Sequence, residues 1–356
     1  MHFDLTDEQK SIRETIGRLL TDRLDMTRAL ALSNAGGLDP ELWREAADLG
    51  VTSILMDEDD GGLGMDLLTL AVIGEELGRA AAGLPVAETA LAAWAVARFG
   101  SEAQKAQWLE RLATGAAVGA LALAQEGVRP DPRNWSLTEG SATGAFYPVA
   151  WAGQADVLIM GLADGRLGLI AADAPGVTIT EADPLDRTRP HATVQLDGAA
   201  VEALPGSAGT GALLFDAVLV ILAADAYGAA KRSIEIATDY AKERKQFDQL
   251  IGSFQAVKHQ LANLVVEIEP SRALVWYAAH AWDAIPEDRS RAAALAKSHL
   301  GSVAVRTTRL TVELHGGIGY TWDYPLHLWL KRTMFDKSYL GLPSHHAQRA
   351  ADLAGW

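Results

Sequence analysis

A cluster of basic side chains is the group in this sequence best suited to bind a phosphate. Lys242, Arg244 and Lys245 lie close together, and Lys258 follows further along the chain. A guanidinium keeps its charge and presents a planar fork of N–H donors, so it matches a pair of phosphate groups better than a lysine does. The basic cluster therefore indicates a cofactor-phosphate site or a solvated face, rather than a nucleic-acid site.

The histidines and the absence of cysteine limit the other chemistry that the chain can carry. Without cysteine there is no thiolate nucleophile, no disulfide, no Cys-ligated zinc and no iron–sulfur cluster. His315, His327 and the adjacent His345 and His346 show no His-Glu-x-x-His or comparable spacing of metal ligands. We therefore predict no metal site, and we expect a cytoplasmic protein.

The charge balance excludes several classes of partner. Asp and Glu number 46 against 31 Lys and Arg, which leaves a net charge of −15. This surplus argues against general binding to nucleic acid or to anionic membranes. The first residues carry acids where a secretory signal has basic and apolar stretches. The longest apolar runs, 115–124 and 217–224, reach about half or less of the roughly 20 residues that span a membrane. We therefore predict a soluble protein with no membrane or nucleic-acid partner.

The elements that must position these residues change twice along the chain. Up to about residue 115 the apolar residues recur at helical spacing, and Thr6 with Gln9 forms the capping-box signature of a first helix. Between 138 and 196, short Val, Ile and Leu runs separated by Gly, Pro and Asp predict antiparallel strands. Long helical patterns then follow over 213–243, 254–284 and 288–315.

This order of elements predicts an α+β chain in which a β-module separates two helical domains. The predicted parts are an N-terminal all-helical domain (1–115), a middle β-domain (116–208) and a C-terminal helical bundle (209–356).

Seven short blocks carry a more specific signal than periodicity does. Four lie in the first helical domain: Phe3–Gln9, Leu42–Gly50, Asp57–Gly64 and Glu75–Arg79. The three most specific lie near the C-terminus: Glu243–Phe247, Ile251–His259 and Glu313–Trp322. In this order, and over nearly the whole chain, the blocks resemble the acyl-CoA dehydrogenase family. The resemblance implies that family's α+β fold, with a middle antiparallel β-domain and a C-terminal four-helix bundle.

The resemblance also implies an FAD enzyme that removes the α- and β-hydrogens of an acyl-CoA thioester. A carboxylate takes the α-proton, the flavin accepts the β-hydride, and hydrogen bonds stabilise charge on the thioester oxygen. Arg244 matches the family arginine that reaches the FAD pyrophosphate of a neighbouring subunit; a surface ion pair with Glu243 or Asp248 is the competing interpretation. The other FAD-binding positions implied in this way are Gln246, Phe247, Gln255, Glu313, Gly316 and Gly317.

Two departures affect the implied cofactor site. Many family members carry a glutamine where this chain has Glu313, and an ionised carboxylate accepts hydrogen bonds but donates none. In the β-domain, the run 125–130 lacks the recognisable flavin contacts of the corresponding family loop. We interpret Trp151 as an ordinary packed tryptophan rather than as a remnant of the family strand that packs against the flavin ring.

The catalytic base is the larger departure. Most of the family carries a glutamate in a Tyr-Glu-Gly-Thr stretch, and Leu340 occupies that position here. A minority carries the glutamate on the helix before the arginine motif, and Val218 occupies that position. Neither side chain can abstract a proton, so we predict no catalytic residue at either place. Asp216 is the first alternative base and Asp323 the second.

Three functions follow from this combination. The favoured hypothesis is a chain that lacks a base and completes the FAD site of a homologous catalytic subunit, resembling the non-catalytic subunits of actinobacterial α2β2 acyl-CoA dehydrogenases of sterol side-chain breakdown. The second is a self-sufficient homomeric dehydrogenase with a displaced base such as Asp216. The third is a structural homologue that binds neither flavin nor CoA. The acyl group of the substrate is not encoded in these motifs.

Overall fold

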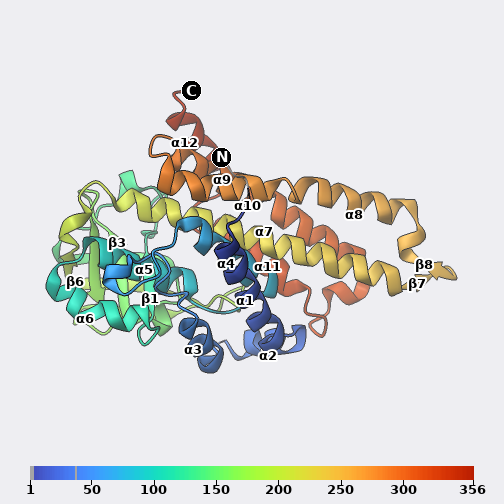
Figure 1. The fold of residues 1–356 in the computed structure, drawn as a ribbon, viewed down its shortest axis with the longest axis horizontal. Coiled ribbons are helices and arrows are strands. Elements are labelled where there is room, and N and C mark those ends of the chain that lie inside the picture. The colour runs from blue at the N-terminus through green and yellow to red at the C-terminus, as the bar shows by residue number, and fades with distance from the viewer. Residues whose placement is uncertain (1–3, 37) are drawn as a thin grey trace.

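The computed structural model describes residues 4–36 and 38–356 and has helices before and after a β-sheet, as predicted. Figure 1 shows the sheet at one end of an elongated molecule, with a long helical bundle that extends to the other end. The helices before the sheet are α1 (Asp7–Arg23), α2 (Met26–Ala35), α3 (Pro40–Asp48), α4 (Leu67–Ala80), α5 (Val86–Phe99) and α6 (Glu102–Ala113).

The start of α1 confirms the predicted capping box. The backbone N–H of Gln9 donates to the Thr6 hydroxyl at 3.2 Å, and the Thr6 N–H donates to the Gln9 side chain at 3.0 Å. Helix α5 lies in the part predicted to be all-helical, but no separate sequence pattern marks it. Its residues from Thr89 to Ala97 are all buried, so it has no polar face and no amphipathic period for a sequence pattern to reveal.

The middle domain contains a six-stranded sheet. Its strands are β1 (Gly119–Ala122), β2 (Gly140–Ala150), β3 (Val157–Gly161), β4 (Leu167–Ala171), β5 (Val177–Glu181) and β6 (His191–Ala203). The spatial order is β1-β3-β4-β6-β2, with β5 paired to β6. The pairings are antiparallel as predicted, except that β1 runs parallel to β3 with Gly119 opposite Val157. The chain between these two strands includes β2, which is long enough a connection for a parallel pair.

The part after the sheet forms the helical bundle. Its elements are α7 (Gly211–Glu243), β7 (Lys245–Gln246), β8 (Gln249–Leu250), α8 (Gln255–Ile268), α9 (Ser271–Ala284), α10 (Arg289–Leu314), α11 (His327–Ser338) and α12 (Pro343–Leu353). Short 3-10 segments connect elements along the chain: η1 (Glu58–Asp60), η2 (Pro132–Asn134), η3 (Ala152–Gln154), η4 (Pro205–Ser207), η5 (Ile251–Ser253) and η6 (Gly316–Tyr320). The prediction of one helix over 254–284 was wrong, because the chain breaks at Glu269 and Pro270, and proline has no N–H to continue the helix.

Helix α7 is the central element of the molecule. A Cβ atom on Gly78 of α4 would lie only 2.0 Å from the carbonyl oxygen of Asp225, so glycine lets α4 and α7 pack backbone against backbone. Within the described part of the chain, α7 is also the one helix long and apolar enough to cross a membrane by length and composition. However, 89% of the most apolar 18-residue stretch of this helix is buried inside the protein, as in the core helix of a soluble protein.

Candidate functional site

The sequence motifs near residues 244 and 316 meet at one end of the bundle. The ring of Tyr240, on the last turn of α7, stacks on the ring of His315, with centroids 4.3 Å apart. His315 follows the end of α10 and directly precedes Gly316. The peptide N–H of Ile251 donates to the carbonyl of Arg244 at 2.8 Å, which brings the chain back toward α7 before α8 begins. The ends of α7 and α10 and the start of α8 therefore form a single surface, which we call the bundle end.

A tight hairpin projects from the bundle end. Strands β7 and β8 pair, and the two residues between them, Phe247 and Asp248, have φ values of +53° and +63°. Positive φ at both central residues is the geometry of a two-residue hairpin whose turn matches the twist of the strands. The Phe247 side chain is 86% exposed, so the hairpin presents an aromatic ring to its surroundings.

Arg244 is exposed beside this hairpin and is not held by a neighbouring acid. Among residues 4–36 and 38–356, its guanidinium forms no ion pair, with Glu243, with Asp248 or with any other carboxylate. Lys242, by contrast, pairs with Asp239 at 3.2 Å. The competing interpretation of Arg244 as half of a surface ion pair is therefore not supported, and its charge is available to an anion.

The remaining residues of the implied FAD site lie at the same end. Gln246 is exposed on β7 and Gln255 is exposed as the first residue of α8. A Cβ atom on Gly316 or Gly317 would meet nothing within 4 Å, so the backbone there faces open space. Glu313 pairs with Arg309 one helical turn earlier, at 3.2 Å, and this arginine compensates the carboxylate that departs from the family pattern.

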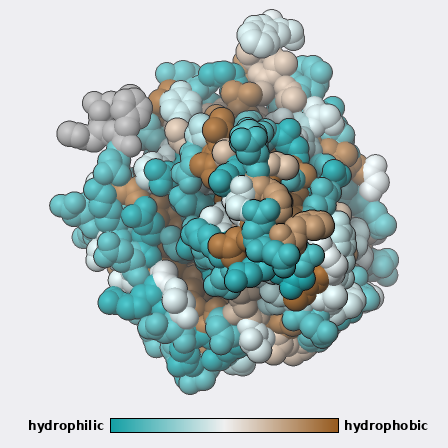
Figure 2. All heavy atoms as spheres, turned by 90° about the vertical axis from the view of Figure 1, so that its right-hand side faces the viewer, coloured by the Kyte–Doolittle hydropathy of each residue, from teal (hydrophilic) through white to brown (hydrophobic). Residues whose placement is uncertain are grey.

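Figure 2 views the molecule from this end and shows hydrophobic side chains among hydrophilic ones on the surface. Large apolar residues of the hairpin and of the segment after α10 are exposed: Phe247, Leu250, Ile318, Tyr320 and Trp322. Exposed aromatic groups beside unpaired cations can bind a molecule with both phosphate and aromatic parts, or another protein chain.

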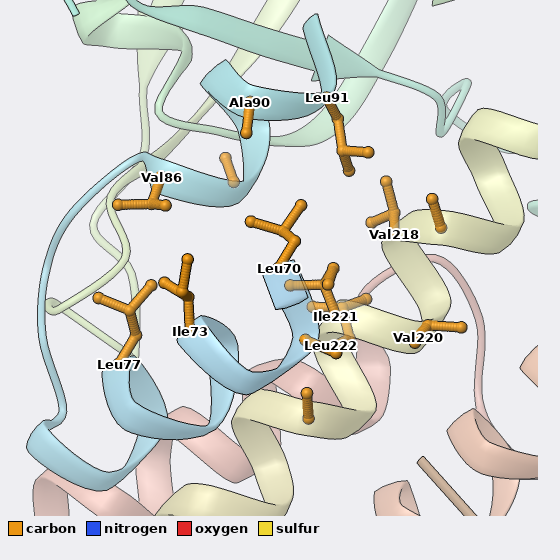
Figure 3. Packing of buried hydrophobic residues seen from close by; sticks show 14 of the residues in the cluster. Leu70, Ile73, Leu77, Val86, Ala90, Leu91, Val218, Val220, Ile221 and Leu222 are labelled. Carbon is orange, nitrogen blue, oxygen red and sulfur yellow. The ribbon is translucent and has the colours of Figure 1, made fainter. Parts of the chain in front are cut away.

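Of the two family positions for the base, Val218 borders a small cavity and Leu340 does not. Val218 is 8% exposed and lines a cavity of about 40 Å³ together with Leu91 and Leu121. Figure 3 shows Val218 of α7 among apolar side chains of α4 and α5. Leu340 is 1% exposed, and the hydroxyl of the preceding Tyr339 donates to the Leu121 carbonyl at 3.4 Å. This volume holds a few water molecules, whereas ligand pockets of drug-sized molecules measure about 300–1,000 Å³.

The two alternative bases do not line this cavity. Asp216 is fully buried, where it pairs with Arg349 at 2.7 Å and accepts a hydrogen bond from the Ser290 hydroxyl. Burial raises the pKa of Asp216, although Arg349 opposes the effect. Asp323 is exposed in the segment after η6. Asp216 therefore occupies a structural ion pair, and the structure separates both acids from the base positions.

Sequence reasoning missed one acid that does line the cavity. Glu88 of α5 faces the same space as Val218, and burial raises the pKa of its carboxyl group. The signal available in the sequence was a single charge at the start of the otherwise apolar run 86–97.

The β-domain side of the cavity is closed by packing. Trp151 lines the cavity and is 1% exposed, in agreement with its interpretation as a packed tryptophan. The loop at 125–130 is held by the chain itself. Gln125 accepts hydrogen bonds from the Ser136 N–H and hydroxyl at 3.1 and 3.0 Å, and Arg129 donates to the His345 carbonyl at 3.2 Å. In the residues that the structure describes, no group of three His, Cys, Asp or Glu is placed to hold a metal ion.

Comparison with known proteins identifies the class. Two family models match, the acyl-CoA dehydrogenase N-terminal domain over residues 6–116 and the acyl-CoA dehydrogenase C-terminal domain over residues 219–349. The chain belongs to the acyl-CoA dehydrogenase family, a family of FAD-dependent oxidoreductases.

Individual relatives cover the whole chain. Acyl-CoA dehydrogenase IpdE2 of Mycolicibacterium smegmatis is 30% identical over 351 residues, which are 97% of this chain and 98% of the relative. Acyl-CoA dehydrogenase IpdE2 of Mycobacterium tuberculosis is 32% identical over 352 residues, 96% of each chain. The solved structure of a Tcur3481-Tcur3483 steroid ACAD variant matches with a TM-score of 0.88 and 30% identity, and covers 98% of both chains.

Proposed function

We propose that this chain is the non-catalytic subunit of a heteromeric, FAD-dependent acyl-CoA dehydrogenase. Its bundle end completes the FAD site of a homologous catalytic subunit, and its own cavity performs no chemistry. The single observation that carries this proposal is the contrast between an exposed Arg244 without an ion pair and two apolar side chains, Val218 and Leu340, at the base positions, with only a small cavity beside Val218.

The donor groups at the bundle end suit one edge of FAD. The Arg244 guanidinium has free N–H donors for a pyrophosphate, and the open backbone at Gly316 and Gly317 allows a close approach. Gln246 and Gln255 add amide groups, while the exposed Phe247 ring offers an apolar contact. These groups form a single exposed wall, so a second chain must supply the rest of the site. When bound, FAD supplies the acceptor for the hydride that leaves the β-carbon of the acyl group.

This chain's own cavity lacks two requirements of the reaction. No carboxylate stands at either base position, and a cavity of about 40 Å³ cannot hold an acyl chain. The protein residues at the bundle end therefore bind and orient the cofactor, and proton abstraction falls to the partner.

The partner and the substrate follow from the relatives. The Tcur3481-Tcur3483 steroid ACAD carries two chain names, which supports an α2β2 complex of two related chains here. That relative and IpdE2 support an acyl-CoA thioester of a steroid degradation product as the substrate. A chain without cysteine and with a net charge of −15 suits a cytoplasmic complex that binds no nucleic acid.

A second candidate is a self-sufficient homomeric dehydrogenase with a displaced base. Glu88 favours it over the other acids, because its carboxyl group faces the cavity and burial holds its pKa above the usual value. Asp216 does not favour this candidate, because its carboxylate is paired with Arg349.

Purification of the chain alone, and after co-expression with a homologous chain that carries the glutamate, tests the proposal. The expected result is a colourless chain alone and a yellow heteromeric complex, judged from flavin absorbance and mass. A yellow homotetramer that oxidises an acyl-CoA by itself supports the second candidate, a homomeric dehydrogenase with a displaced base. A colourless complex supports the third function, a structural homologue that binds neither flavin nor CoA.

A further inference from the structure

A cluster of buried charges closes the cavity beside Val218. Four charged residues line this cavity, and they come from three parts of the chain: Glu88, Arg189, Asp225 and Arg332. Arg189 belongs to the segment between β5 and β6, Asp225 to α7 and Arg332 to α11. Together with Asp336 of α11, the two arginines and two aspartates form one connected group, and we call these four residues the ion cluster.

Arg332 contacts all three domains with one side chain. Its Nε and Nη2 donate to the two carboxylate oxygens of Asp225 at 2.8 and 2.6 Å, within the bundle. Its Nη1 donates to the carbonyl of Ala82, in the N-terminal helical domain, at 2.9 Å. The same nitrogen donates to the hydroxyl of Thr188, in the β-domain, at 2.9 Å. Arg332 is only 3% exposed, so the three domains meet at a buried ionic contact.

Arg189 ties the β-domain to the bundle a second time. Its Nη2 lies 2.7 Å from Asp225, and its Nη1 donates to Asp336. The guanidinium also lies over the Phe335 ring, 5.0 Å from its centroid. Burial by itself raises the pKa of Asp225, but Arg189 and Arg332 outweigh it and lower this pKa to about 2. Asp225 is therefore ionised between the two arginines, whereas burial raises the pKa of Asp336 well above its usual value, against the opposing charge of Arg189.

We propose that the ion cluster is a ligand-independent clasp, which holds the three domains together around the cavity beside Val218. Moving the loop of Arg189 away from α7 and α11 to widen this cavity would break paired charges at buried positions. The clasp gives the chain a fixed shape without a flavin or substrate of its own. This inference concerns residues outside the bundle end and stands without the proposed function.

Thermal unfolding of the full-length chain without flavin tests the clasp. Arg332→Met leaves Asp225 with a single partner and removes the contacts to Ala82 and Thr188, so the Tm should fall by roughly 5–10 °C. Limited proteolysis within residues 182–190 should become about tenfold faster. The matched control is Arg79→Met, which breaks a bidentate pair with Glu235 between α4 and α7 that is about one-third exposed. Loss of this pair should lower the Tm by no more than about 2 °C.

Two further variants keep the test decisive if Arg332→Met does not fold. Thr188→Val retains every charge and removes only the hydroxyl between Arg332 and Asp186, so it should lower the Tm by about 1–4 °C. Arg332→Met combined with Asp225→Leu leaves Arg189 paired with Asp336 and should fold with a Tm closer to the parent than either single variant.

The proposal is overturned if Arg332→Met melts and is cleaved like Arg79→Met. Neither readout involves the partner or turnover, so failure of the clasp is distinguishable from failure of the proposed function.

Discussion

Tyr240 and His315 are stacked at 4.3 Å although 75 residues separate them in the sequence. Arg244 follows Tyr240 by one helical turn, and Gly316 follows His315 directly. This aromatic contact therefore sets the distance between the arginine and the glycine backbone that we propose to hold FAD. The His315 ring is further fixed by its Nδ1, which lies 2.7 Å from the carbonyl of Thr311.

Loss of the stack should weaken flavin binding without unfolding the chain. Tyr240→Ala removes the ring between the ends of α7 and α10, and we expect the flavin content of the complex to fall at least threefold. Tyr240→Phe is the control, because it keeps the stacked ring and loses only a long hydrogen bond of 3.5 Å to His315. The flavin absorbance per complex gives the flavin content of both variants. Equal flavin content in the two variants counts against a role for the stack.

Restoring a glutamate should not restore catalysis. Val218→Glu places a carboxylate against Leu91 in a cavity of about 40 Å³, where an unpaired charge costs several kcal/mol. We expect no acyl-CoA oxidation by the purified chain and a lower Tm, with Val218→Gln as the uncharged control of similar size. Leu340→Glu should also lower the Tm without giving oxidation, because Leu340 is only 1% exposed and its carboxylate replacement would be buried. Measurable turnover by either glutamate variant alone would show that the cavity opens to substrate.

Substitutions of two acids distinguish the proposed function from a homomeric enzyme with a displaced base. In the active complex, Asp216→Asn and Glu88→Gln should each leave kcat within about twofold, because neither group takes part in proton abstraction by the partner. Asp216→Asn should lower the Tm, since Arg349 then lacks its carboxylate partner. A drop in kcat of a hundredfold or more with Glu88→Gln, at unchanged flavin content, assigns the base to this chain.

Burial of Glu75 makes stability depend on pH. Burial raises the pKa of Glu75 from 4.5 to about 7, against the opposing hydrogen bond from Trp276 Nε1 at 2.7 Å. The folded pKa lies above the unfolded value, so the stabilising contribution is complete below pH 4.5 and is lost as the pH rises through 7. The difference corresponds to roughly 3 kcal/mol. Urea unfolding at pH 5 and pH 7.5 should show this loss in the parent chain.

Glu75→Gln is the matched variant for this measurement. The amide oxygen still accepts from Trp276, and the group no longer titrates. We expect most of the difference in unfolding free energy between pH 5 and pH 7.5 to disappear. An unchanged pH dependence in this variant would assign it to other groups, such as Asp283, whose pKa burial raises to about 6.

The sequence predicted the features that depend on local pattern. The capping box of Thr6 and Gln9, the helices at 213–243 and 288–315, and the central sheet are encoded by neighbours within a few residues. Helix α5 was not predicted as a separate element because it is buried on all sides, and the break at Pro270 was a local signal that the helical pattern around it concealed. The parallel β1–β3 pair depends on how distant strands associate, which alternation does not specify.

The candidate sites divide in the same way. The residues of the bundle end could be named from the sequence, because Arg244 and Gly316 lie in motifs that the resemblance supplied, and their role in FAD binding stays a prediction. The ion cluster was not, since Arg332 reaches Ala82 across 250 residues and Thr188 across 144. Single Arg and Asp residues inside apolar helices carry no periodic signal that pairs them. Only the packing of three domains shows that these side chains pair.

The most direct test of the central claim is the flavin content of the heteromeric complex with Arg244→Ala in this chain. Removing an unpaired guanidinium from a pyrophosphate site should weaken FAD binding by about 30-fold or more, so the complex should leave gel filtration with less than about one-tenth of the parent flavin. Lys242→Ala, two residues away but paired with Asp239, is the matched control and should retain its flavin. A complex of Arg244→Ala that stays fully yellow and active would contradict the account.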